Sequence, residues 1–202
     1  MSVVTQPRVP QPDYLKGHAM PHFPIHSLET APEASQPALR GLKDAFGFVP
    51  NIAGVMSTSP VLINCLAALF QNVHGGSFTE SQIQILLLTN AVTNACEWAV
   101  GFHSFLAIQH GIPAGDVEAI RNGALPAESK PAALSKLART VIETRGRLTE
   151  ADADAFLQAG FDKNELLEVI AIVAASTITN YTGSVTRPAL EPPFDAYAWP
   201  KP

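Results

Sequence analysis

Apolar side chains recur along most of this chain at three- and four-residue spacing, the period of a helix with one buried face. No stretch alternates apolar and polar residues between turn signals, as a half-buried strand would. The pattern therefore predicts an all-α protein. The predicted helices cover about residues 34–46, 60–72 and 83–91, a stretch that carries Cys96 and His103 to Gly111, and then about 116–121, 131–145, 149–160 and 162–179.

Local signals mark where several of these helices begin and end. Ser59 stands before Pro60, which suits an N-cap followed by the first helical position. Residues 79–82 (Thr-Glu-Ser-Gln) and 162–165 (Asp-Lys-Asn-Glu) have the spacing of a capping box, so each is expected to open a helix. Glycines expected to end helices follow at Gly111, Gly123, Gly146 and Gly160.

A weak repeat and two proline-rich ends organise the chain. Residues 78–80 and 148–150 each place Thr-Glu before a long apolar segment, which fits two related helical hairpins and equally two independent capped helices. Residues 1–30 hold several prolines without a hydrophobic period, so they are expected to form an extended arm on the core or on a neighbouring subunit. One all-α domain is expected over 31–186, followed by an irregular tail over 187–202.

Composition narrows the classes of function. The chain has 202 residues, 47% of them hydrophobic and 15% charged, so a substantial core and buried subunit contacts are expected. The net charge is −5 and no basic cluster is present, which argues against nucleic-acid binding.

The first residues have neither the basic nor the apolar region of a signal peptide, and the longest apolar runs, 83–88 and 169–175, are too short to span a membrane. We therefore expect a cytoplasmic protein without a membrane partner. Two cysteines in a reducing compartment are expected to be free thiols. Cys65 has an apolar, helical context and is expected to be a small buried side chain.

Three histidines near the N-terminus raise the question of a metal site. His18, His22 and His26 are spaced four residues apart, but Pro21 and Pro24 prevent one helix from holding them on one face. No carboxylate or cysteine is spaced to complete a ligand set. We expect solvated loop histidines, with neither a metal nor another cofactor.

The most informative chemistry lies around Cys96 and His103. The segment has the outline C-x-x-C-x-x-x-H with Ala99 at the second cysteine position. On one helix these three positions would form a single stripe, and Cys96 would lie two turns from His103, on the order of 10 Å. That separation is too long for a direct hydrogen bond along the helix, so direct proton transfer between Cys96 and His103 is not expected.

Several segments together resemble the alkyl hydroperoxidase D-like and carboxymuconolactone decarboxylase superfamily. They are the loop 46–51 (Phe-Gly-Phe-Val-Pro-Asn), Ser59-Pro60 before an apolar helix, 78–80 (Phe-Thr-Glu), and 94–98 (Asn-Ala-Cys-Glu-Trp) leading to His103. The resemblance implies packed helical hairpins that assemble as homo-oligomers, often trimers or hexamers. The loop and the Cys-Glu-Trp surroundings are most similar to the peroxidase-related branch.

The resemblance also assigns roles. In the redox members a CxxC pair reduces hydroperoxides, and a histidine and a glutamate relay protons. By position Cys96 matches the first cysteine, His103 the histidine, Ala99 the second cysteine and Gln84 the glutamate. Without the second cysteine, a sulfenic acid on Cys96 would need an external thiol reductant or Cys65 to resolve it. Gln84 cannot accept a proton as a carboxylate does.

Neighbouring residues have simpler expected roles. Trp98 is expected to pack in the core or an interface, or to form a wall of the substrate pocket. Glu97 falls on another helical face than Cys96 and His103, so it is expected to cap the helix or face solvent. His110, just before Gly111, suits the negative end of a helix dipole.

Three functions follow from these residues. The first is a hydroperoxidase-like oxidoreductase with Cys96 as a lone redox thiol and His103 and Gln84 completing the site. The second is a cysteine-independent decarboxylase, lyase or isomerase, in which His103 transfers protons on a small carboxylated or lactone substrate. The third is a non-catalytic binding protein on the same fold, since a fold alone does not establish chemistry.

Overall fold

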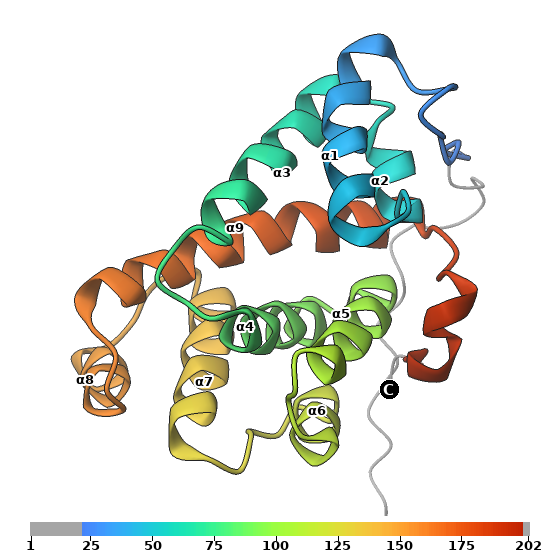
Figure 1. Ribbon diagram of the computed structural model, residues 1–202. Coiled ribbons are helices and arrows are strands. Elements are labelled where there is room, and N and C mark those ends of the chain that lie inside the picture. The colour runs from blue at the N-terminus through green and yellow to red at the C-terminus, as the bar shows by residue number, and fades with distance from the viewer. Residues whose placement is uncertain (1–21, 200–202) are drawn as a thin grey trace, which may run out of the picture.

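The computed structural model describes residues 22–199, which form helices joined by short loops (Figure 1). Across these residues there is no strand, and the predicted all-α class is confirmed. In chain order the elements are the 3-10 helix η2 (Glu33–Ser35), α1 (Gln36–Phe46), α2 (Asn51–Met56), α3 (Pro60–Val73), α4 (Glu80–Thr93), α5 (Glu97–Gln109), α6 (Ala114–Arg121), α7 (Ser129–Thr144), α8 (Glu150–Gln158), α9 (Lys163–Thr186) and the 3-10 helix η3 (Pro192–Tyr197).

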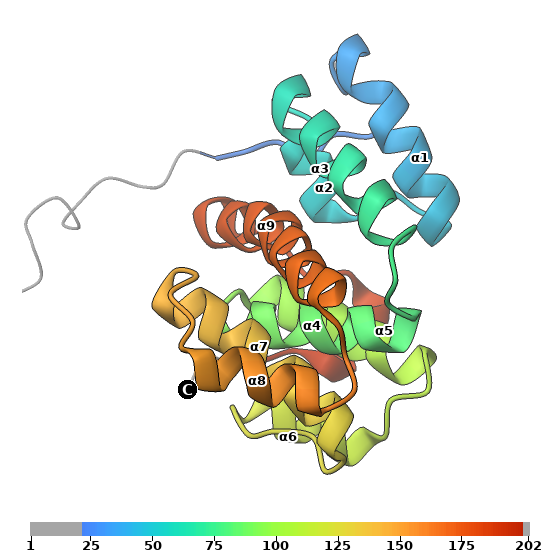
Figure 2. The same ribbon diagram turned by 90° about the vertical axis from the view of Figure 1, so that its left-hand side faces the viewer.

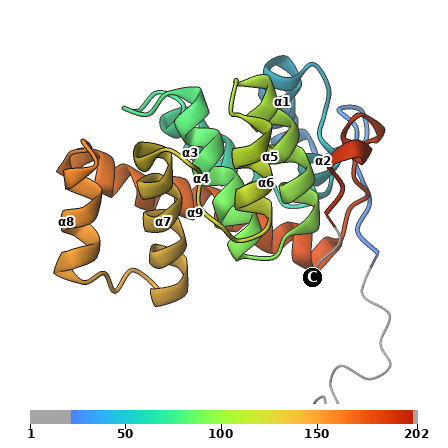
Figure 3. The same cartoon turned by 90° about the horizontal axis from the view of Figure 1, so that it is seen from below.

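The helices form two groups on either side of the long helix α9. Helices α1, α2 and α3 lie on one side of α9, and α4 to α7 lie on the other, as two perpendicular views show (Figures 1 and 2). Seen from below, α7 and α8 stand at one end of α9, while α5, α6 and the C-terminal segment stand at the other (Figure 3). The first three helices and the helices from α4 to α7 therefore face each other across α9.

Helix α4 is the centre of the core. It packs against α5, α6, α7 and α9, and every residue from 83 to 91 is buried. Such a helix is apolar on all sides rather than on one stripe, as expected for an element surrounded by neighbours. The polar residues on α4 are consequently placed inside the protein, and Gln84 is one of them.

The predicted helix signals are found in the structure. The side chains of Thr79 and Asp162 each cap their helix in a complete capping box. Four of the glycines that follow helices have positive φ, where glycine is unstrained; they are Gly111, Gly123, Gly146 and Gly160.

Two expectations about helix extent are wrong. The last helix does not end near 179 but runs to Thr186 as α9, because Asn180 and Gly183 still pack into the core. The segment after the 46–51 loop was not expected to be helical, yet Asn51–Met56 forms α2. This short helix is held by its surroundings, since Gly54 accepts a hydrogen bond from the backbone N–H of His26 at 3.2 Å.

The structure describes parts of both chain ends, which were expected to be an extended arm and an irregular tail. Of the expected arm, residues 1–21, with His18, lie outside the described residues, while His22 and His26 belong to a segment without helix before η2. The expected irregular tail contains η3 and buries Phe194. The tail is therefore part of the folded core as far as residue 199.

By length and composition, α9 is a helix that could cross a membrane. The apolar character of α9 is also explained by packing, because Val169, Ile172 and Ala175 are buried against the other helices. Helices α3, α4, α5 and α7 all contact it. The hydrophobicity of this face of α9 is accounted for by its position at the centre of the fold.

Candidate functional site

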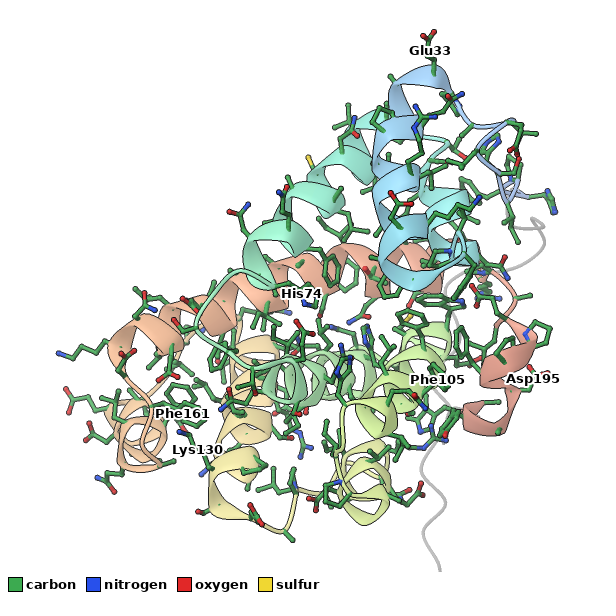
Figure 4. The ribbon with its side chains drawn as sticks, viewed as in Figure 1. Glu33, His74, Phe105, Lys130, Phe161 and Asp195 are labelled. Atoms are coloured by element: carbon green, nitrogen blue, oxygen red, sulfur yellow. The ribbon has the colours of Figure 1, made fainter. Side chains whose placement is uncertain are left out.

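A pocket of about 780 Å³ lies between α1, α2 and α3 on one side and α4 and α5 on the other. Its wall is mainly apolar and includes the aromatic side chains of Phe46, Phe70, Trp98 and Phe102. Its polar lining consists of Gln71, His74, Glu80, Gln84, His103, His110 and Thr179. His74 lies between the two groups of helices, close to the middle of the molecule (Figure 4).

His103 and Gln84 form the buried polar pair of this pocket. Nδ1 of His103 lies 3.0 Å from Oε1 of Gln84, and the two side chains are 5% and 3% exposed. Because an amide oxygen only accepts, His103 donates its Nδ1 proton and keeps Nε2 as an acceptor. Gln84 thus fixes the tautomer of the imidazole.

His103 is held in its neutral form. Burial, with a smaller contribution from His74, lowers the pKa of His103 from 6.5 to about 3. Desolvation disfavours the charged imidazolium, and no carboxylate stands at position 84 to compensate for it. At neutral pH the pocket therefore offers a hydrogen-bond acceptor here, not a cation.

His74 and Glu80 form the partly exposed end of the pocket. Nδ1 of His74 lies 2.8 Å from Oε1 of Glu80, and the side chains are 35% and 45% exposed. The imidazole also stacks on Phe70, with 5.8 Å between ring centroids. Among the described residues that line the pocket none is lysine or arginine, and Glu80 supplies the one carboxylate.

Cys96 is not on the helical stripe expected for it. It is the N-cap residue of α5, with φ −95° and ψ 99°, and follows Ala95 in the left-handed region. The helix begins at Glu97, so Cys96 precedes it, and its sulfur lies against Gly183 of α9. Ala99 and His103 do lie on one face of α5, four residues apart, but the expectation of a single stripe that also contains Cys96 is wrong. The expectation failed because helical spacing was extended across the bend between α4 and α5.

The sulfur of Cys96 is packed against α9. The side chain is 1% exposed, and a Cβ placed on Gly183 would lie only 2.6 Å from Sγ. Burial raises the pKa of the Cys96 thiol, and the backbone N–H groups of Ala99 and Trp98 oppose that effect only in part. Cys96 does not line the pocket.

Cys65 does not match its expectation either. The structure places it on the exposed face of α3 together with Val61, which is 75% exposed. The inward face of α3 carries Ile63 and Leu66 instead. An apolar context could not distinguish these faces, because α3 has apolar residues on both sides.

Trp98 packs in the core, which was one of the expectations for it, and it also lines the pocket. It is 5% exposed, stacks on Phe102 at 4.8 Å between ring centroids, and lines the pocket. Its Nε1 donates to Oε2 of Glu191 at 3.0 Å. Glu191 was not identified from the sequence, because a lone acidic residue in a proline-rich tail gives no signal.

The structure thus brings together three of the four residues singled out from the sequence. Gln84, Trp98 and His103 surround one pocket, and Cys96 lies outside it. Glu97 is exposed in the first turn of α5, as expected. His110 is exposed at the C-cap of α5, at the rim of the pocket.

No protein-family model and no curated protein matches the sequence. Solved structures do match the fold. An uncharacterized peroxidase-related protein from Ralstonia eutropha JMP134, described as an alkylhydroperoxidase AhpD core, is 18% identical, with a TM-score of 0.76 over 88% of this chain and 96% of that one. A peroxidase-related protein from Silicibacter sp. TM1040 is 16% identical, with a TM-score of 0.72 over 87% and 93%.

A third structure differs in its described activity. The debrominase Bmp8, as a cysteine-to-alanine variant in complex with 2,3,4-tribromopyrrole, is 15% identical, with a TM-score of 0.72 over 90% of this chain and 96% of that one. At these identities the likeness concerns the fold, which therefore carries proteins of more than one described activity. The chain has the all-helical fold of the alkylhydroperoxidase AhpD core.

Proposed function

We propose that this protein binds a small neutral molecule in the pocket beside His103, and that its chemistry is cysteine-independent proton transfer by His103. One observation carries the proposal: the imidazole lines a pocket of about 780 Å³, while the Cys96 sulfur is buried against Gly183 outside it. A thiol must ionise and meet its substrate to act as a nucleophile. His103 lines the pocket, where a ligand can reach it, whereas Cys96 does not line the pocket.

The lining of the pocket indicates the chemical class of the ligand. Aromatic walls suit a flat apolar ring, and the Nε2 acceptor of His103 suits a hydrogen-bond donor on that ring, such as a phenolic O–H or a heteroaromatic N–H. The bound 2,3,4-tribromopyrrole of Bmp8 supports this class, since it is a small heteroaromatic molecule held on the same fold.

The charges of the pocket favour neutral ligands over anions. Burying a carboxylate requires a cation or several donors. At the buried end of the pocket His103 is neutral and bonded to Gln84, and at the partly exposed end His74 is already paired with the carboxylate of Glu80. A lyase or isomerase acting on a lactone is therefore better supported than one acting on a carboxylated substrate.

A single-thiol oxidoreductase is the second candidate, and a specific feature favours it. Cys96 stands at the N-terminus of α5, where the N–H groups of Trp98 and Ala99 lower the pKa of its thiol against the larger effect of burial. Reaction with a hydroperoxide would require α9 to move away from Cys96. An external thiol would then have to reduce the resulting sulfenic acid.

Ligand titration tests the proposal. Isothermal titration calorimetry would compare phenol and pyrrole with benzoate as the anionic match, on the wild type, His103→Leu and Cys96→Ala. We expect phenol or pyrrole to bind the wild type and Cys96→Ala equally, and His103→Leu at least about tenfold more weakly, since a buried hydrogen bond is lost. Benzoate binding tighter than phenol, or loss of binding in Cys96→Ala alone, would contradict the proposal.

Turnover separates an enzyme from a binding protein. A reaction that survives Cys96→Ala and is lost in His103→Leu supports proton transfer by His103. Binding that depends on His103, without turnover of any neutral lactone or phenol, would instead assign a non-catalytic binding role to the same pocket.

A further inference from the structure

Glu191 is a buried carboxylate that joins three separate elements. Its side chain is 7% exposed, and it stands between α9 and η3 in the C-terminal segment. Oε2 accepts from the indole Nε1 of Trp98 at 3.0 Å, and Oε1 accepts from the backbone N–H of Asn51 at 2.6 Å. The carboxylate therefore connects the tail to the first turns of α5 and α2, both of which bound the pocket.

The tail that carries Glu191 is fixed along its length. Leu190 packs so closely on Gly101 of α5 that an added Cβ would lie 2.9 Å from it. Phe194 packs on Phe102 and Phe105, with centroids 5.3 and 5.0 Å away. Phe105 extends from α5 on the side where Asp195 marks η3 (Figure 4).

The far end of the tail is held by Arg121. Its guanidinium donates to the carbonyls of Tyr197 and Ala198 at 2.9 and 3.0 Å, and its own carbonyl accepts from Nε1 of Trp199 at 3.2 Å. The position of Glu191 is thus set from both sides, by Leu190 on Gly101 before it and by the contacts of η3 and Arg121 after it. A carboxylate held in place by its own segment can fix the orientation of the groups that bond to it, here the indole of Trp98.

We propose that Glu191 is a positioning residue that fixes the indole of Trp98 as a wall of the pocket and so determines which ring sizes the pocket accepts. The inference rests on the proposed ligand pocket. Without the hydrogen bond to Oε2, the indole N–H would be buried and unpaired, and the ring would rotate to recover a partner. Because Trp98 stacks on Phe102, that rotation would displace two of the pocket's aromatic walls.

The test uses Glu191→Gln in a Trp199→Phe background, in which Trp98 is the remaining tryptophan. Glutamine keeps the shape but replaces one of the two accepting oxygens by an NH2 group, so Trp98 and Asn51 can no longer each donate to an oxygen of their own. We expect the emission of Trp98 to shift to longer wavelength and its fluorescence anisotropy to fall, because the indole is held less firmly. We also expect a phenol-to-1-naphthol affinity ratio at least about tenfold lower, the size of a lost hydrogen bond to a charged group. Glu143→Gln, an exposed change of the same kind on α7, is the control and should alter neither readout.

A second variant keeps the test decisive if Glu191→Gln folds poorly. Trp98→Phe removes the indole N–H and leaves Glu191 bonded to Asn51, and it should shift the same affinity ratio. Unchanged fluorescence in Glu191→Gln, or an unchanged ratio in Trp98→Phe, would overturn the inference. If the wild type binds neither probe, the proposed function fails, whereas the fluorescence still decides whether Glu191 orients Trp98.

Discussion

His103 and Cys96 are both buried, but their surroundings give them different capacities. His103 has a polar partner in Gln84 and lines a pocket, so its second ring nitrogen remains available to a ligand. Cys96 has Gly183 against its sulfur and a pKa raised by burial. Burial alone does not distinguish them; the neighbouring groups do.

Replacing Gln84 by glutamate should make His103 a stronger base. A carboxylate beside the ring would stabilise the imidazolium and raise the pKa of His103 from about 3 by about 1–3 units. NMR titration of the imidazole measures this change, and Gln158→Glu, at the exposed end of α8 and outside this pocket, is the control. A pKa of His103 that stays near 3 in Gln84→Glu would show that the two side chains do not interact.

The neutral state of His103 should make the wild type sensitive to acid. The unfolded chain binds a proton below pH 6.5 and the folded chain only near pH 3, so stability falls as the pH is lowered between these values. Between pH 7 and pH 5 the loss attributable to His103 should be about 2 kcal/mol. Urea denaturation should show a smaller loss in His103→Gln than in the wild type or in the exposed control His110→Gln. Equal losses in all three would contradict the assignment.

The contact between Cys96 and α9 can be measured through Gly183. A methyl group there would meet Sγ at 2.6 Å, so Gly183→Ala should destabilise the protein by about 1–3 kcal/mol. Adding Cys96→Ala should restore at least about 1 kcal/mol. Gly115→Ala on α6, where the new methyl meets nothing, is the control. Additive effects of the two changes would show that the sulfur does not lie against Gly183.

At the scale of the elements, the bend between α4 and α5 decides where Cys96 lies. Ala95 has φ 52°, a left-handed conformation that costs a residue with a Cβ about 1–2 kcal/mol. Cys96 then donates its N–H to the Ala91 carbonyl at 3.0 Å, which closes the end of α4. The bend replaces one continuous helix by two.

Glycine at this bend should therefore stabilise the protein. Ala95→Gly should raise the free energy of unfolding by about 0.5–1 kcal/mol. Gly111→Ala, at the corresponding turn after α5 with φ 81°, should lower it by about 1 kcal/mol. Thermal and urea denaturation measure the change in the free energy of unfolding for both variants. Destabilisation by Ala95→Gly would mean that Ala95 is not left-handed.

The elements predicted from the sequence are those with local signals. The capping box at Thr79 and the glycine at Gly111 act within one turn of chain, so helices with such ends were placed well. Helix α2 has only six residues, and its N-terminus is satisfied by Glu191, far along the chain. The residues of the site also differ in whether the sequence could identify them. Gln84 and His103 were identified because they stand at the proton-relay positions of the family that the sequence resembles, whereas Glu191 has significance only through tertiary contacts that no local pattern contains.

At the scale of the whole molecule, α9 presents apolar side chains on its outer face as well as on its inner one. Leu167, Ile170, Tyr181 and Val185 are 63, 47, 61 and 49% exposed, and Val61 on the adjacent α3 is 75% exposed. A surface of this kind commonly marks a subunit contact. We propose that it joins copies of this chain in a homo-oligomer, for which a trimer or hexamer is expected.

Introducing a charge on this surface should weaken the assembly. Tyr181→Glu should shift the mass measured by light scattering after size-exclusion chromatography towards the monomer, because a buried unpaired carboxylate is costly. Gln109→Glu, at the exposed end of α5, is the control and should leave the mass unchanged. A wild-type protein that is monomeric at all concentrations would contradict the proposal.

The central claim, that the pocket acts through His103 and not through Cys96, is tested most directly by thiol reactivity. Pulsed alkylation of the native protein with mass spectrometry, with and without hydrogen peroxide, follows Cys65 and Cys96 in one experiment. We expect the exposed Cys65 to be labelled rapidly, and Cys96 to be labelled only on unfolding and to form no sulfenic acid. Rapid labelling of Cys96 below its ordinary pKa, with a sulfenic acid trapped after peroxide, would contradict the account and identify a single-cysteine redox protein.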